Sequence, residues 1–117
     1  ELKQVIMNLL NNSKDALEQR DDHRRLIFID IYEENDNAIF FIKDTGGGIP
    51  SDVINNIFKP YFSTKDKDQG TGIGLYMSIE MVEKHMNGQL LVENESFIYD
   101  SISYKGACFK IIIPQNL

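Results

Sequence analysis

A glycine-rich turn that leads directly into a helix most restricts what this chain can fold into. The segment QGTGIGLYMSIEMVEKH, residues 69–85, has three glycines at alternate positions. A glycine turn at a helix N-terminus presents backbone N–H groups and the positive end of the helix dipole, which suit a phosphate. It lacks the GK[ST] ending of a Walker loop, and an ordinary turn is the alternative interpretation. The apolar positions that follow recur at helical spacing: Leu75, Ile79, Val82 and Met86.

Size and charge limit the class of protein. The 117 residues suffice for one domain, and 42% hydrophobic with 26% charged residues is typical of a soluble globular protein. A net charge of −6 argues against binding to nucleic acid or to an anionic membrane surface. The single Cys108 has apolar neighbours, which predicts a buried thiol in a strand and a reducing compartment.

Two long helices and one short helix are predicted from the apolar spacing and the stop signals. We expect them at residues 1–19, at 51–57 after an N-cap at Ser51, and from the glycine turn to Asn87-Gly88. The segment 61–71 has no apolar period and is long enough to be a mobile lid. No apolar run is long enough to span a bilayer, and we expect no signal peptide.

The strands are predicted from runs rich in isoleucine and phenylalanine. We expect a hairpin of 25–32 and 38–43, then strands at 89–93 and 108–113, with the stretch 94–106 between them unplaced. Helices and strands alternate, yet several strands are joined as hairpins. This predicts an α/β two-layer sandwich, with a mixed β-sheet covered on one face by helices.

One face of the first helix is rich in amides. Asparagine costs about half a kcal/mol or more relative to alanine within a helix, so this composition is expensive. Asn8 and Asn12 lie one turn apart, and amide oxygens suit a hard cation such as Mg²⁺. A helix that frays at Asn11-Asn12 is the alternative. The residues on this face are Gln4, Asn8, Asn11, Asn12 and Asp15.

Two further positions are candidates for ligand contacts. Asp44 ends an apolar strand just before Gly46-Gly47-Gly48, where a carboxylate can accept a hydrogen bond from an amine such as that of adenine. A turn capped by the aspartate is the alternative. Lys65 follows the phenylalanine-rich segment IFKPYFS, where it suits either a terminal phosphate or plain solvent.

Together these motifs resemble the catalytic ATP-binding domain of sensor histidine kinases, in the GHKL superfamily with its Bergerat fold. The resemblance covers nearly the whole chain. NLLNNSKDAL is similar to the N box, DTGGGI to the first glycine box, IFKPYFSTK to the F box and GTGIGL to the second glycine box. GACFKIIIP resembles the closing strand of such domains.

The resemblance implies ATP and Mg²⁺ as cofactors and assigns roles to the polar residues. Asn12 would ligate Mg²⁺, Asn8 would help to hold the metal and the phosphates, and Lys65 would contact the terminal phosphate. Many kinases of this kind carry a basic residue where Asp15 stands here, which leaves phosphate contacts near Asp15 open.

The two glycine boxes would form the nucleotide pocket. Asp44 would read the adenine amine, while Gly46, Gly48 and Ile49 would line the purine. The lid hinge and the phosphate contacts would come from the second box: Gly70, Thr71, Gly72, Gly74 and Leu75.

Asn8 separates a kinase from a self-contained ATPase. The ATP-hydrolysing clamps of the superfamily carry a glutamate at this position to activate water, and an amide cannot accept that proton. Phosphoryl transfer to a neutral imidazole needs no such base, since positioning and charge neutralisation carry the catalysis. We therefore expect a protein histidine kinase. The alternatives are a GHKL ATPase, a non-catalytic ATP-binding module and an anti-sigma-factor-type serine kinase.

The expected partners follow from what the sequence contains. Neither His23 nor His85 is followed by an acidic residue, as the phosphoacceptor histidine of such kinases is. We therefore expect residues 1–117 to be a catalytic fragment without the phosphoacceptor and dimerisation domain and without the first strand. The resemblance implies ATP or ADP, the protein's own dimerisation domain and a response regulator as partners, with a homodimeric parent. We expect a cytoplasmic domain, with membrane attachment of the parent left open.

Overall fold

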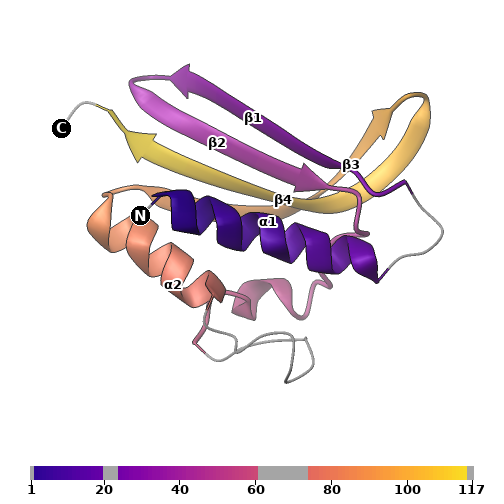
Figure 1. Ribbon diagram of the computed structural model, residues 1–117, viewed down its shortest axis with the longest axis horizontal. Helices are drawn as coiled ribbons and strands as arrows, with labels where there is room; N and C mark the ends of the chain where they lie inside the picture. Colours follow the sequence, from indigo (N-terminus) through magenta and orange to yellow (C-terminus); the bar gives the residue numbers. More distant parts are fainter. Residues whose placement is uncertain (1, 20–23, 61–73, 116–117) are drawn as a thin grey trace.

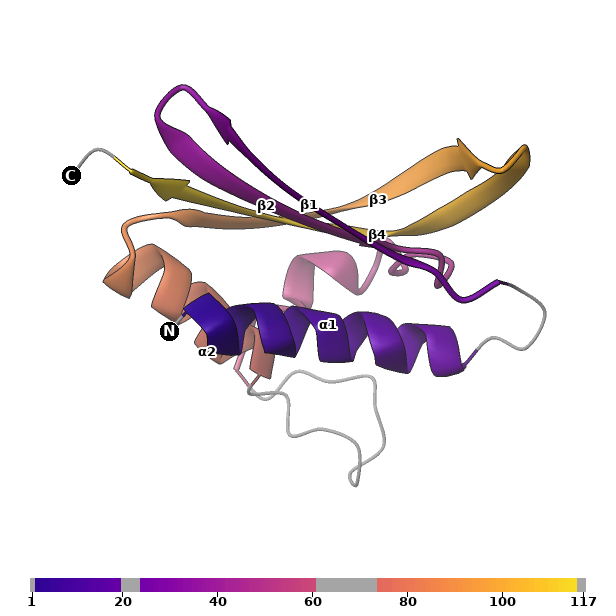
Figure 2. The ribbon, with the colours of Figure 1, turned by 45° about the horizontal axis from the view of Figure 1, so that its top comes forward.

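The computed structural model describes residues 2–19, 24–60 and 74–115 as a sheet with helices against one face (Figures 1 and 2). The first helix and the first hairpin lie within two residues of their expected bounds, and the last two strands are longer than expected. The elements in chain order are α1 (Leu2–Glu18), β1 (Ile27–Glu34), β2 (Asn37–Asp44), the 3₁₀ turn η1 (Ile54–Asn56), α2 (Gly74–Glu80), the π-helical turn η2 (Met81–His85), β3 (Gln89–Tyr99) and β4 (Ile102–Pro114).

The sheet differs in one respect from the mixed sheet that we expected. Its described strands lie in the order β1-β2-β4-β3, and every pairing among them is antiparallel. The helical crossover does bring β3 back in the same direction as β2. However, the β3–β4 hairpin inserts β4 between those two strands, so the parallel pair never forms. The α/β two-layer arrangement with helices on one face is confirmed (Figure 2).

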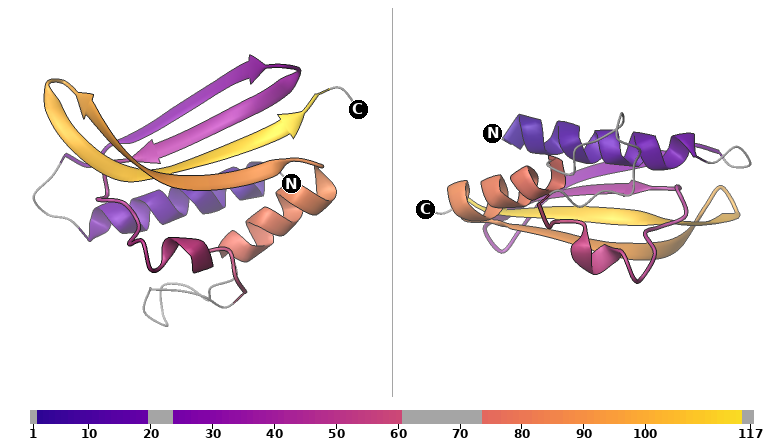
Figure 3. Two further views of the ribbon diagram at one scale, coloured as in Figure 1. Left: turned by 180° about the vertical axis from the view of Figure 1, so that it is seen from behind. Right: turned by 90° about the horizontal axis from the view of Figure 1, so that it is seen from below.

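Both hairpins close through two-residue turns with positive φ at both positions. Asn35 and Asp36 join β1 to β2 with φ of 52° and 64°, and Asp100 and Ser101 join β3 to β4 with φ of 52° and 63°. Turns of this kind match the twist of the paired strands. The stretch 94–106 is thereby placed: it forms the far half of a long, continuous hairpin that extends past the helices (Figure 3).

The core lies between α1 and the sheet. Val5 and Leu9 on α1 pack with Ile42 of β2 and with Phe109 and Ile111 of β4. This buried side of α1 contains the apolar positions that the sequence spacing predicted, since residues four apart share a helix face. The polar side of the helix therefore faces away from the sheet.

The predicted helix at 51–57 is only a 3₁₀ turn, and the N-cap at Ser51 was wrong. The turn begins at Ile54, and its N-cap residue Val53 makes no side-chain capping bond. The Pro50 carbonyl instead accepts hydrogen bonds from the N–H groups of Val53 (2.9 Å) and Ile54 (3.0 Å). A backbone carbonyl thus closes the turn that a serine hydroxyl was expected to begin.

The second long helix ends where the sequence predicted. Asn87 takes a left-handed φ of 55°, and a Cβ on Gly88 would lie 2.3 Å from the Ile112 carbonyl oxygen. Only glycine permits the chain to pass this close to β4. Within the described ranges, no helix is long and apolar enough to cross a membrane.

Cys108 is buried in β4, as predicted. Desolvation by burial raises the pKa of its thiol to about 12. Because the thiolate is the nucleophilic form, this side chain is unreactive at neutral pH.

Two adjacent leucines in β3 provide a matched test of this core. Leu90 is 2% exposed and belongs to the core, whereas Leu91 is 47% exposed on the opposite face. Leu90→Ala should lower the free energy of unfolding by about 2–5 kcal/mol, since it leaves a cavity. Leu91→Ala should change it by about 0.5 kcal/mol or less. Urea unfolding of both variants measures this, and equal losses would contradict the assignment of faces.

Candidate nucleotide site

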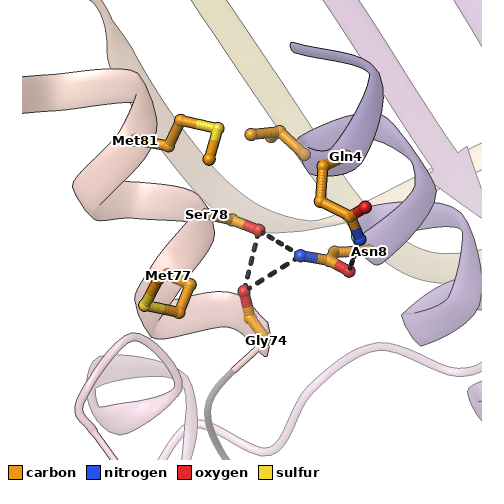
Figure 4. A pocket seen from close by; sticks show the side chains of 7 residues that line it. Gln4, Asn8, Gly74, Met77, Ser78 and Met81 are labelled. Atoms are coloured by element: carbon orange, nitrogen blue, oxygen red, sulfur yellow. Dashed lines mark hydrogen bonds between the residues drawn. The ribbon is translucent and has the colours of Figure 1, made fainter. Parts of the chain in front are cut away.

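The amide of Asn8 joins the first helix to the start of α2 (Figure 4). Its Nδ2 donates to Ser78 Oγ at 3.1 Å and to the Gly74 carbonyl at 3.4 Å, and its Oδ1 accepts from Gln4 Nε2 at 3.1 Å. Ser78 Oγ also donates to the Gly74 carbonyl at 2.8 Å. The structure therefore brings together the N box and the end of the second glycine box, which are far apart in the sequence.

A pocket of about 270 Å³ lies between the two helices at this junction (Figure 4). Met77 of α2 and Met81 of η2 contribute apolar wall, and the Asn8 amide stands at the polar edge of the pocket. It is lined by Gln4, Val5, Asn8, Gly74, Met77, Ser78 and Met81.

Asn12 and Asp15 occupy the next turns of the same helix. Both are half-buried, and the Asn12 Nδ2 donates to the Asn8 carbonyl at 3.0 Å. This bond fixes which end of the amide faces the helix backbone. Helix α1 is continuous through Asn11-Asn12, so the fraying that the sequence left open does not occur.

Asp44 ends β2 as a buried carboxylate, with 2% of its surface exposed. Its Oδ1 accepts from the N–H of Gly46 at 2.9 Å and from the N–H of Ala107 at 3.3 Å. Within the described ranges, both hydrogen bonds seen at this carboxylate go to the same oxygen. The side chain is thus held in one orientation, and Oδ2 is the acceptor left for an amine from outside.

The loop after Asp44 is bound to its surroundings at several points. Thr45 is fully buried, and its hydroxyl donates to the Arg24 carbonyl at 2.8 Å. The Gly47 N–H donates to the Lys105 carbonyl at 2.8 Å. The Asn94 amide makes two hydrogen bonds to the backbone of Ile49, both at 2.7 Å. The loop therefore has one defined shape.

Gly106 permits the closest approach in the site. A Cβ at this position would lie 1.6 Å from the Asp44 carbonyl oxygen and 2.8 Å from its Oδ1. No side chain fits there, so β4 can pass directly against Asp44 only because residue 106 is glycine. Likewise, a Cβ on Gly46 would lie 2.9 Å from Ala16 Cβ, which places that loop glycine against α1.

The predicted site residues are only partly described. Asn8 and Gly74 meet directly, and Asp44, Gly46, Gly48 and Ile49 share one loop. Leu75 packs against the core. Lys65, Gly70, Thr71, Gly72 and the proposed lid lie outside the described residues.

Sequence reasoning missed four residues that hold this site. Ser78 lies one turn after Gly74. The signal available in the sequence was its position on the apolar side of the helix, since a polar residue there needs a partner. Two more, Asn94 and Gly106, lie in the stretch 94–106 that could not be placed, and Ala107 follows it directly.

The family model described as "Histidine kinase-, DNA gyrase B-, and HSP90-like ATPase" matches residues 1–117. The chain belongs to this family. The family resemblance is therefore confirmed, and ATP is the ligand class of the domain.

Relatives and solved structures agree with this assignment. The chain is 34% identical to the sensor kinase CckA of Brucella abortus over 98% of its length, and 37% identical to sporulation kinase A of Bacillus subtilis over 99%. It spans only 12% and 17% of those proteins. The catalytic domain of histidine kinase ThkA matches 97% of the chain, with a TM-score of 0.76 and 28% identity; 66% of that domain is covered.

The Asn8–Ser78 contact can be measured by a double-mutant cycle. Asn8→Ala and Ser78→Ala, singly and together, should show a coupling energy of about 0.5–1.5 kcal/mol in urea unfolding, because each removes the same hydrogen bond. Asn11→Ala replaces an exposed asparagine on the same helix and should be additive with Ser78→Ala. Additive effects for the Asn8 pair would rule out the link between the helices.

Proposed function

We propose that this domain transfers the γ-phosphate of ATP to a histidine on a separate dimerisation domain, as the catalytic part of a sensor histidine kinase. The names of the relatives, which include sensor kinases and sporulation kinases, support this choice within the ATPase family. The single observation that carries it is Asn8, which stands on the helix that faces α2.

Asn8 makes hydrolysis by this domain alone unfavourable. An amide has no basic group, so it cannot accept the proton of an attacking water. Its Nδ2 and Oδ1 are also engaged by neighbours on two helices. The residue therefore aligns α1 with α2. The nucleophile must be one that attacks without first losing a proton to a base, and the unprotonated nitrogen of a neutral histidine is such a group.

Asp44 binds the base in this proposal. Its Oδ2 accepts the exocyclic amine of adenine, while the two backbone N–H groups hold Oδ1. Gly46, Gly48 and Ile49 form the wall beside the purine, since their loop begins at the same carboxylate. The N-terminus of α2 at Gly74 faces the phosphates.

The residues of α1 fit a magnesium ion. The described residues contain no cluster of three histidine, cysteine or acidic side chains that could hold a metal. Asn12 offers an amide oxygen, a hard donor, and Mg²⁺ takes its other ligands from water and phosphate. When bound, the ion would neutralise phosphate charge. The Asn8 carbonyl holds the Asn12 Nδ2, so this bond orients the amide for that role.

The partners and the location follow from the reaction. A phosphorylated histidine is an intermediate, so we propose a phosphoacceptor domain of the same protein, a homodimeric parent and a response regulator as the final acceptor. We propose a cytoplasmic location, because ATP is supplied there. The net charge of −6 disfavours nucleic acid and anionic membrane as partners.

We predict that this domain binds ATP and ADP in the presence of Mg²⁺ but hydrolyses ATP very slowly, because no general base stands at position 8. Isothermal titration calorimetry measures binding, and phosphate release measures turnover. Absence of binding would refute the proposal. Rapid turnover by the domain alone would instead assign it to the ATP-hydrolysing clamps.

Asp44→Asn should weaken ATP binding by about 1.5–3 kcal/mol, the range for a hydrogen bond to a charged group. GTP presents a carbonyl where ATP has its amine, so the unmodified domain should prefer ATP. Asp30→Asn, an exposed position on β1, is the matched control and should leave binding unchanged. Equal affinity for ATP and GTP would mean that Asp44 only shapes the turn.

A further inference from the structure

The β3–β4 hairpin touches Asp44 and the loop after it at three points. The Ala107 N–H reaches the Asp44 carboxylate at 3.3 Å, and the Lys105 carbonyl accepts from the Gly47 N–H at 2.8 Å. The third contact is the side chain of Asn94, which lies directly opposite Ala107 in the β3–β4 register. The hairpin thus binds the start, the middle and the end of one loop.

Asn94 makes its contact as a backbone would. Its Oδ1 accepts from the Ile49 N–H and its Nδ2 donates to the Ile49 carbonyl, each at 2.7 Å. Two opposed residues in an antiparallel ladder exchange the same pair of bonds. The Asn94 amide therefore replaces a strand partner for Ile49, at a point where the loop has left the sheet.

The geometry leaves little choice of side chain at position 94. The contact needs one donor and one acceptor on a short arm, which an asparagine amide supplies. An aspartate would keep the acceptor but place a carboxylate oxygen against the Ile49 carbonyl. The fit is also close on the loop side, since a Cβ on Gly48, whose φ is +86°, would lie 2.8 Å from Asn94 Oδ1.

We propose that Asn94 is a positioning residue for the nucleotide: it fixes Ile49 and so holds the glycine loop in the shape that receives the base. The inference rests on the proposed ATP binding at Asp44. Asn94 itself touches no nucleotide in this account. Its contribution is to remove loop motion before the ligand arrives, which lowers the entropy cost of binding.

The first test needs no nucleotide. Hydrogen exchange resolved by NMR should show the Ile49 amide protected in the unmodified domain and much faster to exchange in Asn94→Ala. The Gly47 amide, held by the Lys105 carbonyl, should stay protected in both and serves as the internal reference. An unchanged Ile49 amide in Asn94→Ala would overturn the proposal.

The second test measures nucleotide affinity. Asn94→Ala should raise the Kd for ATP by roughly five- to thirtyfold and narrow the preference for ATP over GTP. Asn94→Asp should be no better than alanine, because it opposes the Ile49 carbonyl. Ser96→Ala, two residues along the same face of β3, is the control and should bind as the unmodified domain does.

The outcomes separate this inference from the proposed function. If Asp44→Asn weakens binding while Asn94→Ala leaves both the Kd and the ATP preference unchanged, the positioning role is refuted and the nucleotide site stands. If the unmodified domain binds no ATP, both fail. A loss of affinity with an unchanged ATP-to-GTP ratio, accompanied by a lower urea midpoint, would reduce Asn94 to a stabilising residue and also overturn the proposal.

Discussion

The packing of β4 directly against Asp44 is the constraint on which the candidate site depends. Gly106 lets the two backbones approach so closely that a Cβ would meet the Asp44 carbonyl oxygen at 1.6 Å. That approach brings the Ala107 N–H within reach of the carboxylate. A buried carboxylate needs such donors, because desolvating an uncompensated charge is costly. The position of the carboxylate and the start of the glycine loop both follow from this one contact.

The two ends of the site are held by different means. At the loop end, the β3–β4 hairpin supplies backbone groups and the Asn94 amide. At the helix end, Asn8 and Ser78 connect α1 to α2 through side chains and the Gly74 carbonyl. Sheet and helices therefore meet around the space that the nucleotide is proposed to fill. Polar groups with fixed partners at both ends preorganise the site. Such a site favours catalysis by positioning of the reactants over catalysis by proton transfer.

Local sequence patterns were sufficient to predict an element that depends on one hydrophobic period or on one turn. The apolar spacing of residues 1–19 predicted α1 to within a residue at each end, and Asn87-Gly88 marked the end of the second helix. Local patterns failed at one turn and in the order of the strands. Ser51 did not cap a helix because the Pro50 carbonyl closed the turn first. A parallel strand pair did not form because β4 occupies the place beside β2.

The sequence by itself determined the family, since the four boxes are local strings of residues, and their residue types are the basis of the chemistry proposed for the candidate site. It also excluded a general base at position 8. Only the tertiary structure decided what holds those residues in place. Asn94, Gly106 and Ser78 contact Ile49, Asp44 and Asn8, which lie 45 or more positions away, and such contacts depend on the tertiary fold rather than on neighbours in sequence. A hydrogen-bond partner is a property of three-dimensional distance, which no local pattern contains.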